Sequence, residues 1–313
     1  MKLNKPKFWD EKKSLISIFL FPFSIITILI DYFRRISSKQ IVFKIPIICV
    51  GNIYIGGTGK TPTSIFLANE LKKIGKNPVI VKKFYEDQKD EQELIKKYFN
   101  NIILNKTREE AIRDAERRGF DCVILDDGFQ DYKIKKDLNI VCFNQNQQIG
   151  NGLIFPSGPL RQSLKYLKNA EIILINGNKD IEFEKKILKK NTKLEIFYTK
   201  YMPYNIADYK KKDLFVISGI GNPRNFFELL EKNDLKIKKK MIYPDHYNFS
   251  KAEFLEFIKE SDKNNYQIVV TEKDYMKIAK FNLGKIKFLG VSLEMKNKND
   301  FIKRIIKLYD KKD

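Results

Sequence analysis

The sequence predicts an α/β protein with a doubly wound parallel sheet, a second α/β set after it and a membrane-associated helix before it. Three observations predict this fold. Continuous apolar runs alternate with helical segments from Ile45 to residue 177. A second alternation of the same kind begins near Leu214. The segment from Ser14 to Ile30 consists of 17 uncharged residues close to the N-terminus.

The composition is that of a folded protein with few metal-binding or disulfide-forming residues. The chain has 313 residues, of which 43% are hydrophobic and 13% aromatic, and this excludes a largely disordered chain. With one His and three Cys, neither a zinc site nor a disulfide framework is expected. Cys49, Cys122 and Cys142 lie inside apolar runs, so we expect buried strand residues in a reducing compartment.

The chain is strongly basic, with 60 Lys and Arg against 39 Asp and Glu and a net charge of +21. Such an excess favours anionic partners, namely nucleic acid, an anionic lipid surface or phosphorylated substrates. The aromatic residues lie mostly in apolar runs and do not interleave with basic residues as base stacking requires. We therefore expect no nucleic-acid partner.

The apolar segment from Ser14 to Ile30 predicts a membrane-associated helix, either monotopic or a short span, with the rest of the chain in the cytoplasm. As a helix it is about 25 Å long, short of the roughly 30 Å hydrocarbon core, and Pro22 lies in its middle. Its polar side chains share one arc of about 80°, which suits a helix at a membrane interface. These residues are Lys13, Ser17, Ser24, Thr27 and Asp31. The alternatives are a signal peptide, although no small-residue cleavage site follows, and a buried core helix.

Five apolar runs are predicted to form the first sheet, because strands buried on both faces read as continuous apolar runs. They are IPIICVGN (45–52), NPVIVKK (77–83), FDCVILDDG (120–128), LNIVCFN (138–144) and AEIILING (170–177). Helices are predicted between them at residues 61–74, 91–99 and 107–118. Gly75 is expected to end the first of these helices.

The second set is predicted to contain three strands, two helices and a Lys-rich helix that closes the chain. The strands are LFVISGIGNP (214–223), QIVVTEKD (267–274) and IKFLGVSL (286–293). One helix is expected to end at Glu231 and another to cover residues 252–259. The stretch 193–212 contains charges and Pro203, so it is the predicted junction between the two sets.

The string GGTGKT at residues 56–61 predicts a phosphate-binding loop between a buried strand and a helix. Glycines allow backbone N–H groups to wrap a phosphate chain, Lys60 would reach the β- and γ-phosphates, and the Thr61 hydroxyl would bind Mg²⁺. The expected nucleotide-binding residues are Gly56, Gly57, Thr58, Gly59, Lys60 and Thr61. Tyr54 replaces the first glycine of the strict pattern, and a plain turn is the alternative.

Asp126 and Asp127 follow the apolar run CVIL, which places two carboxylates at the carboxyl edge of the sheet beside the phosphate loop. One of them is expected to hold Mg²⁺, directly or through water. By itself this run is an ordinary strand end. Together with the phosphate loop it indicates nucleoside-triphosphate chemistry.

Two further candidates concern proton transfer. His246 is the single histidine, and its imidazole is a candidate to orient or assist a catalytic carboxylate, with a structural hydrogen bond as the alternative. Asp90 and Glu91 form a carboxylate pair after the second predicted strand, near the expected active edge. A solvated charge run at a helix start is the alternative for this pair.

Taken together, six strings resemble the tetraacyldisaccharide 4′-kinase family of lipid A biosynthesis. They are VGNIYIGGTGKTP (50–62), DDGFQ (126–130), NGLIFPSGPLR (151–161), GIGNPRNFF (219–227), YPDHYNFS (243–250) and TEKD (271–274). The strings occur in the order of the family and span most of the chain from residue 45 to 274. The irregular phosphate loop and the N-terminal helix are features of the family as well.

The resemblance implies roles for residues on the acceptor side. In the family a carboxylate after the second strand works with the His of a D-H motif. Asp90 in KDEQ (89–92) is the matching catalytic base and His246 its partner, with Lys60 as the third catalytic residue. The chain departs from the family at KKFYE (82–86), where S-R-G-Y-G is usual.

The resemblance also implies ligands for the metal and the substrate. Asp126 and Asp127 match the acidic pair of the family near Mg²⁺, with Thr61 as a further metal ligand. Arg161 and Asn52 lie in matching strings and are expected to bind substrate.

The implied function is an ATP-dependent lipid kinase that transfers the γ-phosphate to the 4′-hydroxyl of a tetraacyldisaccharide 1-phosphate. The implied fold is a P-loop-type three-layer α/β/α domain at residues 41–200, with a second, smaller α/β/α domain at 201–313 and a membrane-associated segment at 1–40. ATP and Mg²⁺ are the expected cofactors. The expected partners are the lipid-linked disaccharide 1-phosphate and an anionic membrane surface, without an obligate protein partner. The expected location is the cytoplasmic face of the bacterial inner membrane.

Two alternatives stay open at this point. One is another P-loop small-molecule kinase or NTPase, which would share the phosphate loop and the acidic pair but not need the membrane helix. The other is a non-catalytic, polybasic, nucleotide-binding protein of the membrane surface, in which the unusual segment 82–92 marks lost activity.

Overall fold

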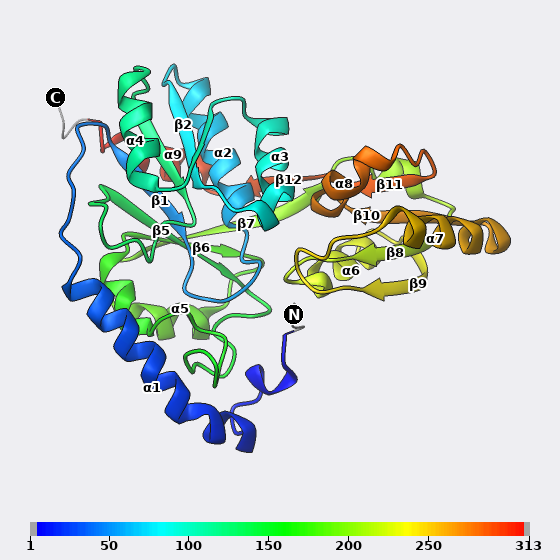
Figure 1. The fold of residues 1–313 in the computed structure, drawn as a ribbon, viewed down its shortest axis with the longest axis horizontal. Helices are drawn as coiled ribbons and strands as arrows, with labels where there is room; N and C mark the ends of the chain where they lie inside the picture. Colours follow the sequence, from blue (N-terminus) through cyan, green and yellow to red (C-terminus); the bar gives the residue numbers. More distant parts are fainter. Residues whose placement is uncertain (1–4, 310–313) are drawn as a thin grey trace. The chain divides into compact units, whose positions relative to one another are not determined.

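The computed structural model describes residues 5–309, and the chain divides into two compact units. The first, which we call the phosphate-loop unit, consists of Pro6–Phe84, Phe99–Lys200 and the segment that starts at Leu293. The second unit contains Tyr85–Tyr98 and Tyr201–Ser292. Both combine helices with a parallel sheet (Figure 1), which confirms the predicted α/β class.

An eight-stranded sheet forms the centre of the phosphate-loop unit, in the order β12-β7-β6-β5-β1-β4-β2-β3. The adjacent strands from β7 to β3 pair in parallel. Strands β1, β4 and β6 are buried at every residue, which explains their continuous apolar sequences. The strands are β1 (Ile47–Gly51), β2 (Pro78–Lys83), β3 (Ile102–Asn105), β4 (Cys122–Asp126), β5 (Leu138–Asn144), β6 (Ile172–Asn176), β7 (Glu195–Pro203) and β12 (Val291–Met295).

Helices cover both faces of this sheet, because successive strand side chains point to opposite faces and both sets are buried. On one face α4 and α5 join a core with alternate strand residues, and Phe183 of α5 meets Phe143 edge to face. On the other face α2 packs against β1, β2 and β4, and Phe66 of α2 meets Phe301 of α9. The helices are α2 (Lys60–Lys73), α4 (Arg108–Arg117), α5 (Ile181–Leu188) and α9 (Lys298–Ile306).

The three cysteines lie on neighbouring strands of this sheet. Cys49 on β1, Cys122 on β4 and Cys142 on β5 are buried free thiols, as predicted. Burial raises the pKa of the Cys49 thiol to about 11 and that of Cys142 to about 12, so both stay protonated at neutral pH.

Helix α1 (Leu15–Ile36) is longer than the predicted uncharged segment and continues through Pro22. Its serines face the protein: Ser24 donates to the Ile154 carbonyl at 2.8 Å, and Asn151 donates to Ser17 at 3.1 Å. The polar arc expected from the sequence is therefore the side of α1 that packs against the loop 151–157. Most of its large apolar side chains are exposed, among them Leu15, Phe19 and Phe33. Helix α1 lies at the outer edge of the phosphate-loop unit (Figure 1).

By length and composition, α1 is the one helix among residues 5–309 that is long and apolar enough to cross a membrane. A signal sequence or the core helix of a soluble protein passes the same test. A core helix is mostly buried, whereas only 11% of the apolar window of α1 is buried, so the core-helix alternative does not fit. The helix by itself gives weak support for membrane association.

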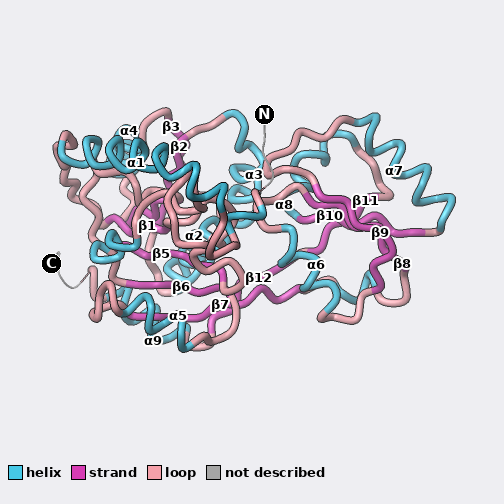
Figure 2. The backbone as a smooth tube through the Cα atoms, turned by 90° about the horizontal axis from the view of Figure 1, so that it is seen from below, coloured by secondary structure: helices cyan, strands magenta, loops and turns pink. Residues whose placement is uncertain are grey.

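The second unit is built on a four-stranded parallel sheet in the order β11-β10-β8-β9. Its core on one face is aromatic, with Phe215 and Phe254 each packing edge to face against Phe257. Figure 2 shows these strands in magenta with the helices of this unit around them. The elements are α3 (Lys89–Tyr98), β8 (Asp213–Ser218), α6 (Pro223–Glu231), β9 (Lys236–Ile242), α7 (Lys251–Asn264), β10 (Tyr266–Thr271), α8 (Glu272–Ile278) and β11 (Ile286–Leu289).

Three strands were not predicted from the sequence, namely β3, β7 and β9, and each of them is buried at one residue at most. β7 occupies residues that were predicted as a junction, and its residues are mostly only partly buried, so its sequence lacks the apolar run of an inner strand. β9 was not predicted. Its sequence KIKKKMI alternates between more and less exposed positions at the edge of the sheet, where lysines are favoured because they oppose pairing with other chains.

Two element boundaries also differ from the expectations. The predicted strand 267–274 stops at Thr271, because its hydroxyl accepts a hydrogen bond from the Asp274 backbone and caps α8. The predicted strand 286–293 is divided at Gly290 into β11 and β12, which belong to different sheets. A Cβ at Gly290 would lie 2.1 Å from the Tyr204 ring, so any other residue there would require the exposed Tyr204 side chain to move.

Candidate active site

The phosphate loop connects the end of β1 to the start of α2. Asn52 is completely buried, and its amide donates to Thr58 Oγ1 at 2.9 Å and to the Gly56 carbonyl at 3.3 Å. Gly56 and Gly59 have φ values of 117° and 92°, a region that side chains with a Cβ rarely adopt. The sequence therefore folds a tight loop whose last residue precedes Lys60, at a helix N-terminus suited to bind anions.

Asp126 ends β4 beside Val50 of β1, which places its carboxylate next to the start of α2. Its Oδ2 accepts from Thr61 Oγ1 at 3.0 Å and from Lys82 Nζ at 2.8 Å, and its Oδ1 accepts from Ser64 at 3.1 Å. The Asp126 and Lys82 side chains are 0% and 4% exposed. Lys82 is therefore the buried counter-ion of Asp126, and three protein donors already occupy this carboxylate.

Asp127 follows with the uncommon φ of 60° and is more open than Asp126, with 26% of its side chain exposed. Arg161 Nη1 lies 2.9 and 3.1 Å from its two oxygens, and Lys60 Nζ lies 3.8 Å from Oδ1. Burial opposes the charged form, but the positive charges of Lys60, Arg161 and Lys82 outweigh it and hold the pKa of Asp127 at about 2. Asp127 is thus ionised at neutral pH, and its partly exposed side chain lies beside Lys60 at the start of α2.

The pair of Lys82 and Asp126 gives a stability prediction. Lys82→Met keeps the length of the side chain but leaves a buried carboxylate without its counter-ion, so we expect a loss of about 3–5 kcal/mol in the free energy of unfolding. Urea denaturation of the wild type and of Lys82→Met measures this difference in the free energy of unfolding. The double variant Lys82→Met/Asp126→Asn, which removes both charges, should recover part of the loss. A single variant as stable as the wild type would contradict the assigned role of Lys82.

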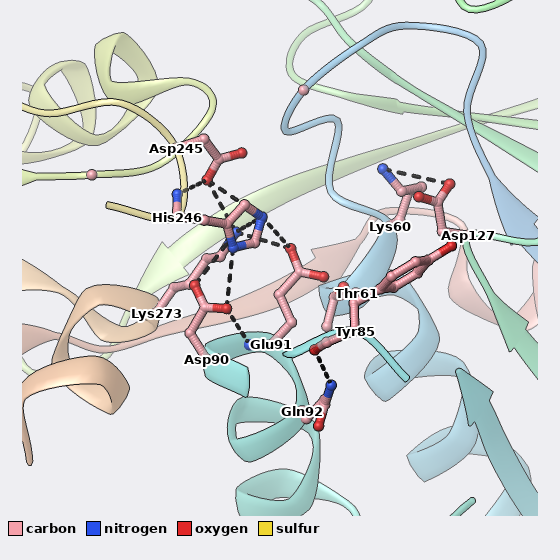
Figure 3. Close-up of polar contacts among 12 residues, drawn as sticks. Lys60, Thr61, Tyr85, Asp90, Glu91, Gln92, Asp127, Asp245, His246 and Lys273 are labelled. Carbon is pink, nitrogen blue, oxygen red and sulfur yellow. Dashed lines mark hydrogen bonds and ion pairs between the residues drawn. The ribbon is translucent and has the colours of Figure 1, made fainter. Parts of the chain in front are cut away.

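A second cluster lies in the second unit, around the first turn of α3. Asp90 Oδ1 accepts from the Glu91 backbone at 2.9 Å and lies 3.2 Å from Nδ1 of His246, although the two residues are 156 positions apart. Asp90 Oδ2 is buried and has no hydrogen-bond partner among residues 5–309, with Lys277 Nζ at 3.5 Å and Lys273 Nζ at 3.9 Å. Figure 3 shows the side chains of Asp90, Glu91, Asp245 and Lys273 around the imidazole of His246. The cluster thus contains a buried carboxylate with one oxygen that makes no hydrogen bond to the described residues.

The charge of Asp90 is maintained by its neighbours. Burial opposes the charged form, but the hydrogen bond from His246 and the charges of Lys273 and Lys277 outweigh it and hold the pKa of Asp90 below its ordinary value. Because the side chain of Asp90 is only 2% exposed, solvent screens these charges little. Asp90 is therefore ionised at neutral pH, as a proton acceptor requires.

Lys273 lies at the centre of the same cluster. Its Nζ lies 2.9 Å from Glu91 Oε1, 3.2 Å from Asp245 Oδ1 and 3.3 Å from His246 Nε2. Burial would lower the pKa of Lys273, but the charges of Glu91, Asp245 and Asp90 outweigh it and raise that pKa. Lys273 is thus an ammonium ion that touches the imidazole of His246 on the side opposite Asp90.

The structure brings most of the sequence-predicted residues into these two clusters. Thr61 and Asp126 are in contact, Lys60 and Arg161 both lie beside Asp127, and Asp90 is in contact with His246. Asn52 lies inside the phosphate loop, fully buried. The remaining predicted loop residues are Gly56, Gly57, Thr58 and Gly59, between Asn52 and α2.

Five residues of these clusters were not predicted as site residues from the sequence, one of them Asp245, which precedes His246 in the chain. Lys82 is the penultimate residue of a predicted strand, and a lysine near the carboxyl end of a buried strand was the available signal for it. Ser64 lies one helical turn after Lys60, so its spacing was a signal. Lys273 belongs to the string TEKD, and Lys277 lies one turn later on α8, but nothing local indicates that either would meet Asp90.

A parallel α/β sheet with a glycine-containing loop at a helix start, and a strand-end carboxylate bonded to the threonine of that loop, defines a P-loop-type protein. The family model of tetraacyldisaccharide-1-P 4′-kinase, LpxK, matches residues 16–97 and 85–310. The chain belongs to this family, and it is a kinase.

Known proteins similar to this chain match it along nearly its whole length. A tetraacyldisaccharide 4′-kinase of Pelagibacter ubique (strain HTCC1062) is 44% identical over 316 residues, covering 99% of this chain and 100% of the relative. One of Rickettsia canadensis (strain McKiel) is 34% identical, covering 98% of each chain. The crystal structure of the "apo" form of LpxK from Aquifex aeolicus in complex with ATP has a TM-score of 0.69 at 22% identity, covering 94% of this chain and 99% of that one. This structure supports the fold.

Proposed function

We propose that the protein transfers the γ-phosphate of ATP to the 4′-hydroxyl of a tetraacyldisaccharide 1-phosphate, a step of lipid A biosynthesis. The observation that carries the proposal is the 44% identity to a tetraacyldisaccharide 4′-kinase over the full length, which includes both clusters of the site. The structure of the Aquifex aeolicus relative in complex with ATP supports ATP as the donor. The phosphate loop and the cluster around Asp90 provide the two kinds of group that the transfer needs.

On the donor side, the loop from Gly56 to Thr61 is proposed to bind the phosphates of ATP. Its backbone N–H groups and the start of α2 favour anions, and Lys60 provides a positive charge for the γ-phosphate. We propose that Arg161 binds substrate, because 29% of its side chain is exposed and its ion pair with Asp127 fixes its position. The side chain of Asn52 is buried, so it would contribute to substrate binding by holding the loop in its conformation through its hydrogen bonds to Gly56 and Thr58.

The residues at the phosphate loop fit a Mg²⁺ ion that binds together with ATP. The Thr61 hydroxyl donates its proton to Asp126, so its oxygen lone pairs stay available, and Asp127 is an ionised carboxylate that is partly exposed. Thr61 and Asp127 would hold the ion, while Asp126, already occupied by Lys82, would orient Thr61. No group of three or more His, Cys, Asp or Glu side chains within residues 5–309 could hold a metal, so phosphate oxygens would complete the ligand set. Bound Mg²⁺ supplies positive charge that neutralises the phosphates.

On the acceptor side, Asp90 is proposed to be the catalytic base. As the 4′-oxygen forms its bond to the γ-phosphorus, the bond from that phosphorus to the β–γ bridging oxygen breaks and ADP leaves. The proton of the hydroxyl passes to Asp90, whose Oδ2 has no other hydrogen-bond partner among the described residues. His246 holds Asp90 through Oδ1.

Incubation of the purified protein with γ-labelled ATP, Mg²⁺ and tetraacyldisaccharide 1-phosphate in detergent micelles tests the proposed function. We expect label on the lipid, at the 4′ position. If folded protein binds ATP but labels no lipid, the proposed acceptor is wrong. If label appears on other alcohols at the same rate, the protein is a kinase of different specificity.

We further propose that α1 attaches the protein to the cytoplasmic face of the bacterial inner membrane, an anionic surface that suits the basic chain. Phe19, Ile26 and Phe33 lie on one side of α1 and are 76%, 54% and 59% exposed. Replacing all three with serine should lower co-sedimentation with vesicles that contain anionic phospholipid. Because these side chains are exposed, the thermal midpoint in detergent should change little. Undiminished vesicle binding by the triple variant would contradict the role of α1.

A further inference from the structure

The position of Lys273 Nζ beside Nε2 of His246 bears on which nitrogen of the imidazole carries the proton. A lysine ammonium has donors only, so at 3.3 Å its partner Nε2 must be the accepting nitrogen. In a neutral imidazole one nitrogen accepts and the other donates, so the proton is then on Nδ1. Nδ1 lies 3.2 Å from Asp90 Oδ1, so in this tautomer His246 donates the hydrogen bond to Asp90.

This direction of the hydrogen bond decides how Asp90 presents its oxygens. With Nδ1–H and the Glu91 backbone N–H both donating to Oδ1, that oxygen is fully engaged. Oδ2 is left as the oxygen without a hydrogen bond, beside Lys277 at 3.5 Å. With the proton on Nε2 instead, Nδ1 would present a lone pair to the Asp90 carboxylate, which repels it.

The cluster holds Lys273 and His246 in place before any substrate binds. Lys273 lies in the first turn of α8, where Thr271 caps the helix, and Glu91 and Asp245 both contact its Nζ. His246 has a φ of 56°, an uncommon conformation for a residue with a Cβ, and its backbone N–H donates to the Asp245 side chain at 3.0 Å. The ring is thus oriented by its own backbone and by residues on two other elements.

We propose that Lys273 is a positioning residue for the catalytic base: by donating to Nε2 of His246 it keeps the imidazole neutral with its proton on Nδ1, and this proton fixes Asp90 with Oδ2 available for the acceptor proton. The proposal rests on the proposed function for the role of Asp90. The arrangement of Lys273, His246 and Asp90 can be tested separately from that role.

The charged groups that face the imidazole explain why the loss of Lys273 matters. Asp90 lies on one side of the ring, while Glu91 Oε1 and Asp245 Oδ1 lie 3.7 and 3.8 Å from Nε2. In the wild type Lys273 neutralises these last two carboxylates. In Lys273→Met both carboxylates lose this ammonium while they still face Nε2, so the ring is expected to take up a second proton and to become an imidazolium next to Asp90.

Nitrogen NMR of the imidazole provides a direct test, because the chain contains one histidine and its ring signals need no assignment. In full-length protein labelled with ¹⁵N-histidine and without a histidine tag, we expect a protonated Nδ1 and an unprotonated Nε2 at neutral pH. In Lys273→Met we expect both nitrogens protonated, or a mixture of forms. A wild-type ring protonated on Nε2, or a spectrum that Lys273→Met leaves unchanged, would overturn the proposal.

Kinetics provides the second readout. We expect kcat of Lys273→Met to fall about tenfold and to rise with pH through neutrality as the ring loses its second proton, a dependence that the wild type lacks. Lys277→Met is the comparator, because Lys277 lies beside Asp90 Oδ2, and it should leave the proton of the imidazole on Nδ1. Lys285→Met, an exposed lysine paired with Asp262 in the same unit, controls for the loss of a positive charge and should change neither readout.

The two readouts separate this proposal from the proposed function. If the NMR results are as expected but Asp90→Asn keeps its turnover, Asp90 is not the base and the proposed mechanism fails, while the assigned arrangement stands. If labelled phosphate reaches the lipid but kcat of Lys273→Met has the magnitude and pH dependence of the wild type, the kinase assignment stands and the positioning role fails.

Discussion

Replacing Lys60 with methionine is expected to reduce transfer of the ATP γ-phosphate about 100- to 1,000-fold, because a fixed positive charge at the transferring group stabilises the transition state. Lys60 begins α2 directly after the left-handed Gly59, so methionine keeps the backbone and the side-chain length. The measurement is the rate at which label from γ-labelled ATP appears on the lipid acceptor.

The same substitution should leave the protein folded. Asp127 keeps its contact with Arg161 at 2.9 Å, and its pKa should rise from about 2 because Lys60 makes the largest favourable contribution to its charge. Lys72→Met is the matched control, since Lys72 is an exposed lysine in the last turn of the same helix. A folded Lys60→Met protein that transfers phosphate at the wild-type rate would refute the role of the phosphate loop.

Replacing Asp90 with asparagine is expected to lower kcat about 100- to 10,000-fold, the range by which a general base accelerates a reaction. Asparagine has the shape of aspartate, and its carbonyl can still accept from Nδ1 of His246, but it cannot take up the proton of the acceptor hydroxyl. ATP binding should be retained, because the phosphate loop belongs to the other unit.

Steady-state kinetics with varied ATP and varied lipid separates a loss of kcat from a loss of ATP affinity. Asp262→Asn is the matched control, an exposed aspartate of the same unit that pairs with Lys285. A loss of ATP affinity with unchanged kcat would place Asp90 in nucleotide binding instead. The kcat of the wild type should also stay constant as the pH is lowered from neutrality toward 4. The pKa of Asp90 lies below its ordinary value of 3.8, so the carboxylate becomes protonated only as the pH falls through that lower pKa.

The lowered pKa of Asp90 also determines how its charge affects the free energy of unfolding. A carboxyl group whose pKa is lowered in the folded protein stabilises the fold above its unfolded pKa, and this contribution disappears as the pH falls through the folded pKa. The ionised form of Asp90 therefore stabilises the second unit throughout the neutral range.

The inner strands and the phosphate loop were predictable from the sequence, because their signals are local. Burial on both faces requires continuous apolar runs, which identify β1, β4 and β6. The glycines before Lys60 reflect backbone angles that other residues rarely adopt. Asp126 could be placed beside this loop because parallel strands end at the same edge of a sheet.

Strands with little burial were not predictable in this way. The edge strand β9 presents alternate lysines and lacks an apolar run, and β7 is only partly buried along its length. At Gly290, where residues 286–293 divide, the side chain of Tyr204, 86 positions earlier in the chain, fills the space that a Cβ would need.

The sequence by itself determined the class of this protein: a parallel α/β fold with a phosphate loop, an acidic strand end and an apolar N-terminal helix whose polar residues share one side. Each of these features depends on side-chain periodicity or backbone angles within a few residues. Only the tertiary structure decided that Lys82 neutralises Asp126, that the serines of α1 face the protein, and that Lys273 and Lys277 surround the pair of Asp90 and His246. These contacts join residues that lie far apart in the chain, and the charge and proton position of each group depend on neighbours that only folding brings together.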